Sequence, residues 1–222
     1  MPPKSKTKSP KPQASFLNTA YLLVYNALSA ALWATVLAKV VLTAAGKGVA
    51  SGAVYVEAER FTRLTQTVAG LEVLHSLLGV VRAPVFTTLM QVASRFLLVW
   101  GIAYHFPQTT QYSPAYSSML VAWSVTEIIR YSYFVFVIAG KGVPAFVTWL
   151  RYNTFLILYP IGISSETWLV KNAIAPAEKM NQNYGYALWA ILAIYVPGSY
   201  VLFTHMLKQR RKIMSPSAKK SQ

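Results

Sequence analysis

The chain contains no cysteine and no aspartate, and these absences narrow the chemistry open to it. Without cysteine there is no disulfide, no thiolate metal ligand and no cysteine nucleophile. The three histidines, His75, His105 and His205, lie far apart and lack the spacing of metal ligands. The sequence also lacks a Gly-x-Gly-x-x-Gly dinucleotide fingerprint and a Gly-x-Ser-x-Gly nucleophile elbow. We therefore expect neither a metal nor an organic cofactor.

Acidic residues are scarce, and the formal net charge is +15. All six acids are glutamates: Glu57, Glu59, Glu72, Glu127, Glu166 and Glu178. The basic excess is concentrated at the two ends of the chain, before the first apolar run and after the last. Under the positive-inside rule both termini are predicted to be cytosolic. Because these basic residues flank apolar runs and do not line a folded face, no nucleic-acid partner is expected.

The apolar content is that of a polytopic membrane protein, since 55% of the residues are hydrophobic. Six apolar runs approach the length of about 20 residues that a membrane-spanning helix needs. They lie at about 19–41, 64–81, 84–103, 117–139, 145–170 and 184–207. The prediction is an all-α protein with six transmembrane helices in one bundle. Its three parts are a disordered basic tail at 1–15, a transmembrane domain at 16–207 and a basic cytosolic tail at 208–222.

Starting from a cytosolic N-terminus, the order of the spans assigns a side to each connection. The turns at 82–84 and 140–144 are predicted to face the cytosol. Loops at 42–63, 104–116 and 171–183 are predicted to face the opposite side. The first and sixth spans carry mainly aromatic and small residues, so we expect them to act as scaffold.

Ionisable residues inside the spans are costly, and membrane helices keep them where they face the bundle interior. Glu72, Arg95, Glu127 and Arg130 lie in the second, third and fourth runs, and we predict that they form ion pairs there. Arg151 lies in the fifth run. These residues can either hold the bundle together or support a site, and buried ion pairs alone do not decide between the two.

The fifth run also contains the octapeptide Tyr-Pro-Ile-Gly-Ile-Ser-Ser-Glu at 159–166. A charged carboxylate at the centre of a membrane helix costs roughly 2.5–3.5 kcal/mol. Glu166 follows Tyr159 by about two helical turns, roughly 10 Å, so both side chains would share one face of a regular helix. Pro160 and Gly162 between them disturb that regularity. An acid and a phenol facing one pocket in lipid indicate proton-transfer chemistry.

Two other motifs imitate known sites. His75, Ser76 and Arg82 follow the spacing of the phosphatase signature His-Cys-x5-Arg, but that chemistry requires a thiolate where this chain has serine. The pentapeptide Ala-Gly-Lys-Gly-Val occurs at 45–49 and again at 139–143, and neither copy has the context of a phosphate-binding loop. We therefore expect neither phosphatase activity nor nucleotide binding.

Five motifs in order point to one family. They are Leu-Glu-Val-Leu-His at 71–75, Gln-Val-Ala-Ser-Arg at 91–95, Trp-Ser-Val-Thr-Glu-Ile-Ile-Arg-Tyr at 123–131, Trp-Leu-Arg-Tyr at 149–152 and the octapeptide at 159–166. This set resembles the very-long-chain (3R)-3-hydroxyacyl-CoA dehydratases, once called protein-tyrosine-phosphatase-like proteins. The resemblance covers residues 15–207 and implies that Tyr159 and Glu166 are catalytic.

The resemblance further implies a six-span endoplasmic-reticulum protein that acts in the third step of very-long-chain fatty-acid elongation. The reaction removes water from a (3R)-3-hydroxyacyl-CoA and yields the trans-2-enoyl-CoA, without a cofactor. The implied partners are membrane lipid and the elongase, 3-ketoacyl-CoA reductase and enoyl-CoA reductase of the cycle. Residues 219–222 resemble a dilysine retrieval signal, which is read on the cytosolic face.

Such a dehydration requires a base for the C2 proton and an acid for the departing hydroxyl, and it profits from a donor to the thioester oxygen. Glu166 and Tyr159 can divide the first two roles, with ionised Glu166 taking the C2 proton while Tyr159 polarises the leaving hydroxyl. The reverse assignment needs a tyrosinate, and because an unperturbed phenol titrates near 10, a cation such as Arg151 or Arg130 would have to lie close. The sequence leaves this assignment open.

Arg151 precedes Tyr159 by eight residues, roughly 12 Å along a helix toward the cytosolic side. We therefore expect a cytosol-facing mouth for CoA near Arg82, Lys141 and Arg151. Two other functions stay open: a non-catalytic scaffold of the elongase assembly with a vestigial pair, and a small transporter. The two halves of the chain lack the repeat symmetry typical of transporters, which counts against the latter.

Overall fold

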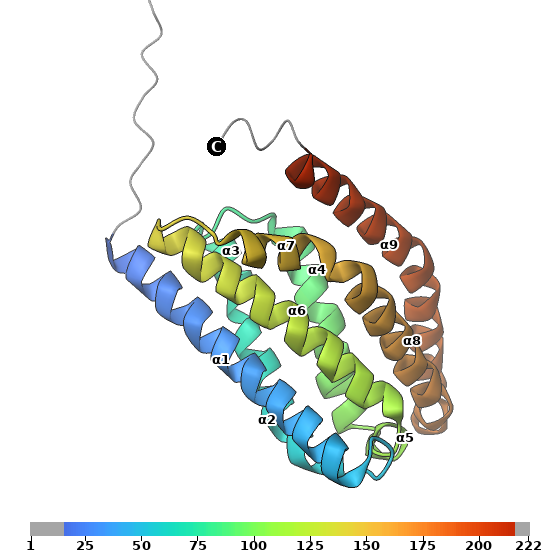
Figure 1. The fold of residues 1–222 in the computed structure, drawn as a ribbon. Helices are drawn as coiled ribbons and strands as arrows, with labels where there is room; N and C mark the ends of the chain where they lie inside the picture. Colours follow the sequence, from blue (N-terminus) through green and yellow to red (C-terminus); the bar gives the residue numbers. More distant parts are fainter. Residues whose placement is uncertain (1–15, 216–222) are drawn as a thin grey trace, which may run out of the picture.

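The computed structural model describes residues 16–215, and all of its regular structure is helical (Figure 1). The predicted disordered tail at 1–15 and the dilysine-like end at 219–222 lie outside the described residues. The elements are α1 Phe16–Lys47, α2 Ala53–Ala69, α3 Leu71–Leu77, α4 Val85–Phe96, the π-helical segment η1 Leu97–Tyr104, α5 Pro107–Thr110, α6 Pro114–Ala139, α7 Ala145–Asn153, α8 Phe155–Met180 and α9 Gln182–Met214.

The helices form one bundle, with α6 between α1 and α8 and with α9 along the outer side of α8 (Figure 1). The contact of α1 with α6 follows from spacing along the chain. Tyr25, Trp33, Val36 and Val40 recur at helical intervals and are all buried. The Trp33 ring meets the Trp123 ring of α6 edge-on at 6.4 Å. An apolar stripe on each helix therefore fixes this central pair.

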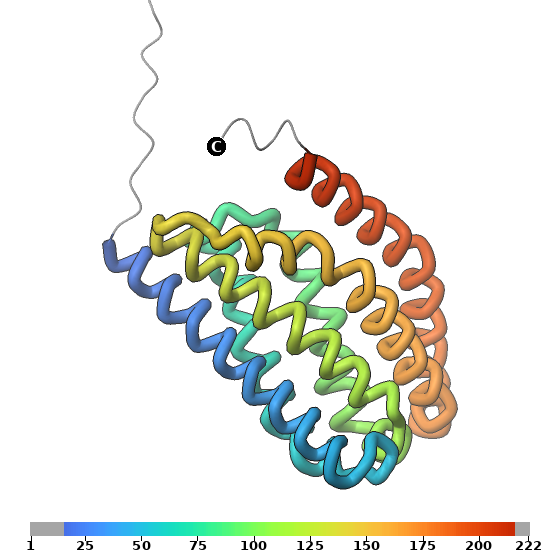
Figure 2. The backbone as a smooth tube through the Cα atoms, viewed as in Figure 1, coloured from blue at the N-terminus to red at the C-terminus, as the bar shows by residue number. Residues whose placement is uncertain are grey.

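Both ends of the bundle carry the connections that the topology predicts for them. The first turn of α1, the α3–α4 turn, the α6–α7 turn and the last turn of α9 lie at one end (Figure 2). The α1–α2, η1–α6 and α8–α9 connections lie at the other end. The turns predicted to be cytosolic thus share an end with the helix termini that lead into the basic tails.

Four helical segments in the described part of the chain are long and apolar enough to cross a membrane: Phe16–Lys47, Val85–Tyr104, Pro114–Ala139 and Gln182–Met214. They contain the first, third, fourth and sixth predicted spans. The predicted span at 64–81 is divided at Gly70 and ends at Leu77, and the one at 145–170 is divided at Thr154.

Two of the predicted loops were wrong, because helices continue into them. The 42–63 loop is shortened from both sides, since α1 reaches Lys47 and α2 begins at Ala53. The 171–183 loop is almost wholly helical, since α8 reaches Met180. Both extensions bury small residues at helical spacing, among them Ala173 and Ala177 in α8.

Prolines inside two helices shape the surroundings of the octapeptide. Pro160 in α8 and Pro197 in α9 each lack the N–H that would donate to a carbonyl one turn earlier. Helix α9 is visibly curved along its length (Figure 2). Tyr195 and Ser199, on either side of Pro197, both make hydrogen bonds to α8.

Candidate active site

Tyr159 and Glu166 both line a cavity of about 430 Å³, which we call the main cavity. Its walls come from α2, α3, α4, α6, α7, α8 and α9. The two side chains face the same space from one helix, as their seven-residue spacing predicts. They make no hydrogen bond to each other, so a reacting group can lie between them.

The Glu166 carboxylate is held by two neutral donors from different helices. Its Oε1 accepts a hydrogen bond from Trp123 Nε1 at 2.7 Å, and its Oε2 accepts one from the Tyr195 hydroxyl at 3.0 Å. Among the described residues no cation forms an ion pair with it. Glu166 is thus oriented from α6 and α9 at once, without a neutralising partner.

The Tyr159 hydroxyl donates to the Ser199 carbonyl oxygen of α9 at 3.1 Å. Its ring stacks on Phe203, with the ring centroids 5.8 Å apart. These contacts fix the phenol at the cavity wall while its oxygen keeps lone pairs for a further partner.

Four of the predicted residues form one ion-pair network centred on Arg130. Its two terminal nitrogens donate to Glu72 at 2.6 and 3.0 Å, and its Nε donates to Glu127 at 2.7 Å. The second oxygen of Glu127 pairs with Arg95 at 2.6 Å. The predicted ion pairing is confirmed, and two cations balance two anions inside the bundle, which offsets part of their desolvation cost.

The network reaches the Glu166 carboxylate through an aromatic ring. The Arg95 guanidinium lies 4.7 Å from the centre of the Trp123 ring, and the same indole donates to Glu166. A cation over an aromatic face is attracted by the ring quadrupole. The Arg95–Glu127 pair therefore helps to fix the indole that orients the acid.

Arg151, on α7, also lines the main cavity. No described residue forms an ion pair or hydrogen bond with it. Its guanidinium lies over the rings of Tyr133, Phe134 and Tyr152, at 4.4, 5.0 and 5.9 Å. All seven predicted site residues thus line this one cavity, whereas Arg82 and Lys141 of the predicted CoA mouth do not.

Three contacts of the site were missed from the sequence. Trp123 and Tyr195 hold Glu166, and the Ser199 carbonyl accepts from Tyr159. The prediction that the sixth span is only scaffold was wrong, because two of these residues lie on α9. The sequence signal that could have indicated Tyr195 is a hydroxyl-bearing side chain two residues before Pro197 inside an apolar run.

The phosphatase-like residues have structural partners outside the main cavity. Ser76 Oγ donates to the Ala83 carbonyl at 2.7 Å and so closes the α3–α4 turn. His75 Nε2 shares a 2.7 Å hydrogen bond with the Tyr21 hydroxyl. Nor do the described residues bring together three side chains that could hold a metal ion.

The fold and this site define a class: an all-helical membrane protein with an acid, a phenol and an ion-pair network around one interior cavity. Residues 66–216 match the family described as "Protein tyrosine phosphatase-like protein, PTPLA". The chain belongs to this family.

Curated relatives match nearly the whole chain. A Schizosaccharomyces pombe protein named "Probable very-long-chain (3R)-3-hydroxyacyl-CoA dehydratase" is 47% identical over 207 residues, 92% of this chain and 98% of the relative. The Arabidopsis thaliana dehydratase PASTICCINO 2 is 41% identical, over 91% and 96%. The human very-long-chain (3R)-3-hydroxyacyl-CoA dehydratase 2 is 34% identical, over 90% and 82%. No solved structure shows a significant match.

Proposed function

We propose that this chain is a hydro-lyase that converts a very-long-chain (3R)-3-hydroxyacyl-CoA into the trans-2-enoyl-CoA. The observation that carries the proposal is the main cavity, where Tyr159 and Glu166 face one space in a chain whose full-length relatives are named dehydratases. The reaction is redox-neutral and needs only an acid, a base and a means of stabilising the thioester oxygen.

The two side chains can complete the proton balance of this reaction. Ionised Glu166 takes the proton from C2 and the C3–O bond breaks. The Tyr159 hydroxyl turns from the Ser199 carbonyl toward the substrate and gives its proton to the departing oxygen to form water. The proton now on Glu166 then returns to the phenolate, which restores both groups. The carbon–carbon double bond forms from the electrons of the broken C2–H bond.

Glu166 is the better candidate for the base. A tyrosinate needs a cation nearby, and no described cation contacts Tyr159, whose hydroxyl donates to the Ser199 carbonyl. Glu166, by contrast, accepts two hydrogen bonds, which stabilise its ionised form. This contrast supports Glu166 as base and Tyr159 as acid.

Arg95 is placed to support the thioester oxygen. Its guanidinium has five N–H donors, and Glu127 is its one ion-pair partner among the described residues. Since Arg95 also lines the main cavity, its remaining donors can stabilise negative charge that develops on the thioester oxygen.

Apolar side chains in the same cavity suit the acyl chain. Those in its wall include Ala69, Val92, Leu158, Ile163 and Leu202. A very long acyl chain gains free energy when it leaves water for such a surface, at about 25 cal/mol per Å² buried. The acyl chain would continue from this wall between the helices toward membrane lipid.

The protein would act in the endoplasmic-reticulum membrane, in the third step of fatty-acid elongation, with both termini cytosolic. We assign six passes, the α2–α3 and α7–α8 pairs adding two to the four apolar segments. The basic last turns of α9 support this orientation. An elongase, a 3-ketoacyl-CoA reductase and an enoyl-CoA reductase would be its partners in the cycle.

The test is turnover by the purified full-length protein in detergent, with a long-chain (3R)-3-hydroxyacyl-CoA as substrate. Wild type should form the enoyl-CoA, and Tyr159→Phe and Glu166→Gln should each lower kcat about 10²- to 10⁴-fold. Tyr200→Phe and Glu57→Gln are matched controls, because both residues are exposed and neither lines the cavity. Both controls should turn over at the wild-type rate.

Two outcomes would count against the proposal. Full turnover by the two site variants would remove Tyr159 and Glu166 from the chemistry. No turnover by folded wild type, with the elongation partners supplied, would favour the non-catalytic scaffold.

A further inference from the structure

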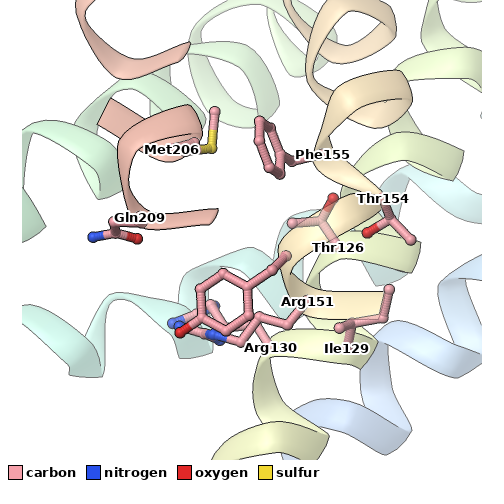
Figure 3. Close-up of a pocket in the computed structure, with 9 residues that line it drawn as sticks. Thr126, Ile129, Arg130, Arg151, Thr154, Phe155, Met206 and Gln209 are labelled. Atoms are coloured by element: carbon pink, nitrogen blue, oxygen red, sulfur yellow. The ribbon is translucent and has the colours of Figure 1, made fainter. Parts of the chain in front are cut away.

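A second, smaller cavity of about 180 Å³ adjoins the main one, and we call it the outer cavity (Figure 3). Its wall is built from α6, α7, the start of α8 and the last third of α9. The residues used below are Arg130, Arg151, Phe155, Met206 and Gln209.

The two cavities share part of their wall. Arg130, Arg151, Phe155 and Met206 line both of them. Gln209 lines only the outer cavity and is exposed, so it lies at the rim. A long ligand that lies past Gln209 would therefore have its next segment beside the main cavity.

The outer cavity contains an uncompensated positive charge. The Arg130 guanidinium is already engaged by Glu72 and Glu127. The Arg151 guanidinium is partly buried, lies over aromatic rings and has no hydrogen-bond acceptor among the described residues. Its donors therefore stay available, and a bidentate anion such as phosphate matches their planar geometry.

The surrounding surface reinforces this charge. The last turns of α9 carry Lys208, Arg210, Arg211 and Lys212. Arg210 is anchored beside the cavity, because its Nε donates to Asn153 of α7 at 2.9 Å. The last turns of α9 contain no acid, so the rim attracts anions.

We propose that the outer cavity binds the phosphate-bearing head of an acyl-CoA, with Arg151 contacting a phosphate directly. The inference rests on the proposed function. Of Arg82, Lys141 and Arg151, the three cations expected from the sequence to surround the CoA mouth, it assigns the phosphate contact to Arg151. Arg151 on α7 and Tyr159 on α8 line the same main cavity. The pantetheine arm then extends along the shared side chains and delivers the thioester to Tyr159 and Glu166.

The test compares two substrates that carry the same 3-hydroxyacyl group, one as the CoA thioester and one as the pantetheine thioester, which has no phosphate. Arg151→Gln removes the charge and keeps a polar side chain. It should raise KM for the CoA thioester about 10- to 100-fold, with kcat within twofold of wild type. For the pantetheine thioester its kcat/KM should equal that of wild type.

Arg151→Lys and Lys179→Gln complete the set. The lysine variant keeps the charge without the planar fork, so its KM for the CoA thioester should fall between wild type and Arg151→Gln. Lys179 is exposed near the opposite end of α8, and its substitution should change neither substrate's KM. The proposal would be overturned if Arg151→Gln and Arg151→Lys lowered kcat/KM equally for both thioesters. An unchanged KM for the CoA thioester would overturn it too.

Binding separates this inference from the proposed function. If wild type converts neither thioester, the proposed function fails, and affinity for desulfo-CoA still tests the outer cavity. Binding to wild type that weakens at least tenfold in Arg151→Gln supports the subsite. Equal binding by the two proteins, or no binding to wild type, overturns it.

Discussion

Replacing Tyr195 by phenylalanine removes one of the two hydrogen bonds that orient Glu166 and leaves the aromatic ring in place. The Tyr195 hydroxyl donates to Glu166 Oε2 at 3.0 Å, while Trp123 holds the other oxygen. A hydrogen bond to a charged group contributes about 1.5–3 kcal/mol. Because the Trp123 bond remains, we expect a loss near the lower value, about a tenfold fall in kcat.

KM should change less than twofold in this variant, because Tyr195 does not line the main cavity. The assay is initial-rate formation of enoyl-CoA by purified protein over a range of substrate concentrations. Tyr200→Phe is the matched control, since this exposed tyrosine lies on the same helix and its hydroxyl has no described partner. In a Glu166→Gln background, Tyr195→Phe should cause no further loss of kcat, because the hydroxyl acts only by positioning the carboxylate that the first change has already removed.

A wild-type kcat in Tyr195→Phe would show that this hydrogen bond does not position Glu166. A rise in KM at constant kcat would instead place Tyr195 in substrate binding. A full additional loss in the Glu166→Gln background would show that the hydroxyl acts independently of the carboxylate.

Two further predictions concern the fold and the phosphatase-like motif. Arg130→Met should lower the free energy of unfolding by about 3–5 kcal/mol, measured by denaturation in mixed micelles, because Glu72 loses its cation. Arg60→Met, at an exposed arginine that forms no ion pair within residues 16–215, should stay within about 0.5 kcal/mol of wild type, and an equal loss in both variants would contradict the network's role. Ser76→Ala should keep the dehydratase kcat, and neither it nor wild type should hydrolyse p-nitrophenyl phosphate. Hydrolysis by wild type that is lost in Ser76→Ala would give the motif a catalytic role.

Spacing along the sequence predicts contacts within one helix but not the partners across helices. Glu127 and Arg130 are three residues apart on one helix, a spacing at which side chains meet. That Arg130 also binds Glu72, 58 residues away, depends on how α3 packs beside α6. The sequence therefore predicts which residues belong to the network, and the structure shows which of them pair with one another.

Helix ends were predicted less well than helix centres. Hydropathy marks the apolar part of a helix, and Lys171 was taken as the start of a loop for that reason. Helix α8 continues past it because Ala173 and Ala177 are buried at helical spacing. The same mismatch applies to α2, which begins at Ala53, well before the apolar run.

The partners of the octapeptide could not be predicted because tyrosine and tryptophan in apolar helices are usually packing residues. Trp123 and Tyr195 lie 43 and 29 residues from Glu166 in the sequence. Only the packing of α6, α8 and α9 brings these donors to one carboxylate.

Base catalysis by Glu166 is tested most directly by the rate of enoyl-CoA formation from a long-chain (3R)-3-hydroxyacyl-CoA in Glu166→Gln relative to wild type. The glutamine keeps the size of the side chain and can still bond to Trp123 and Tyr195, so the fold should persist. Wild type should be active, and kcat should be about 10²- to 10⁴-fold lower in the variant. A variant rate equal to that of an active wild type would contradict the role of Glu166 as base.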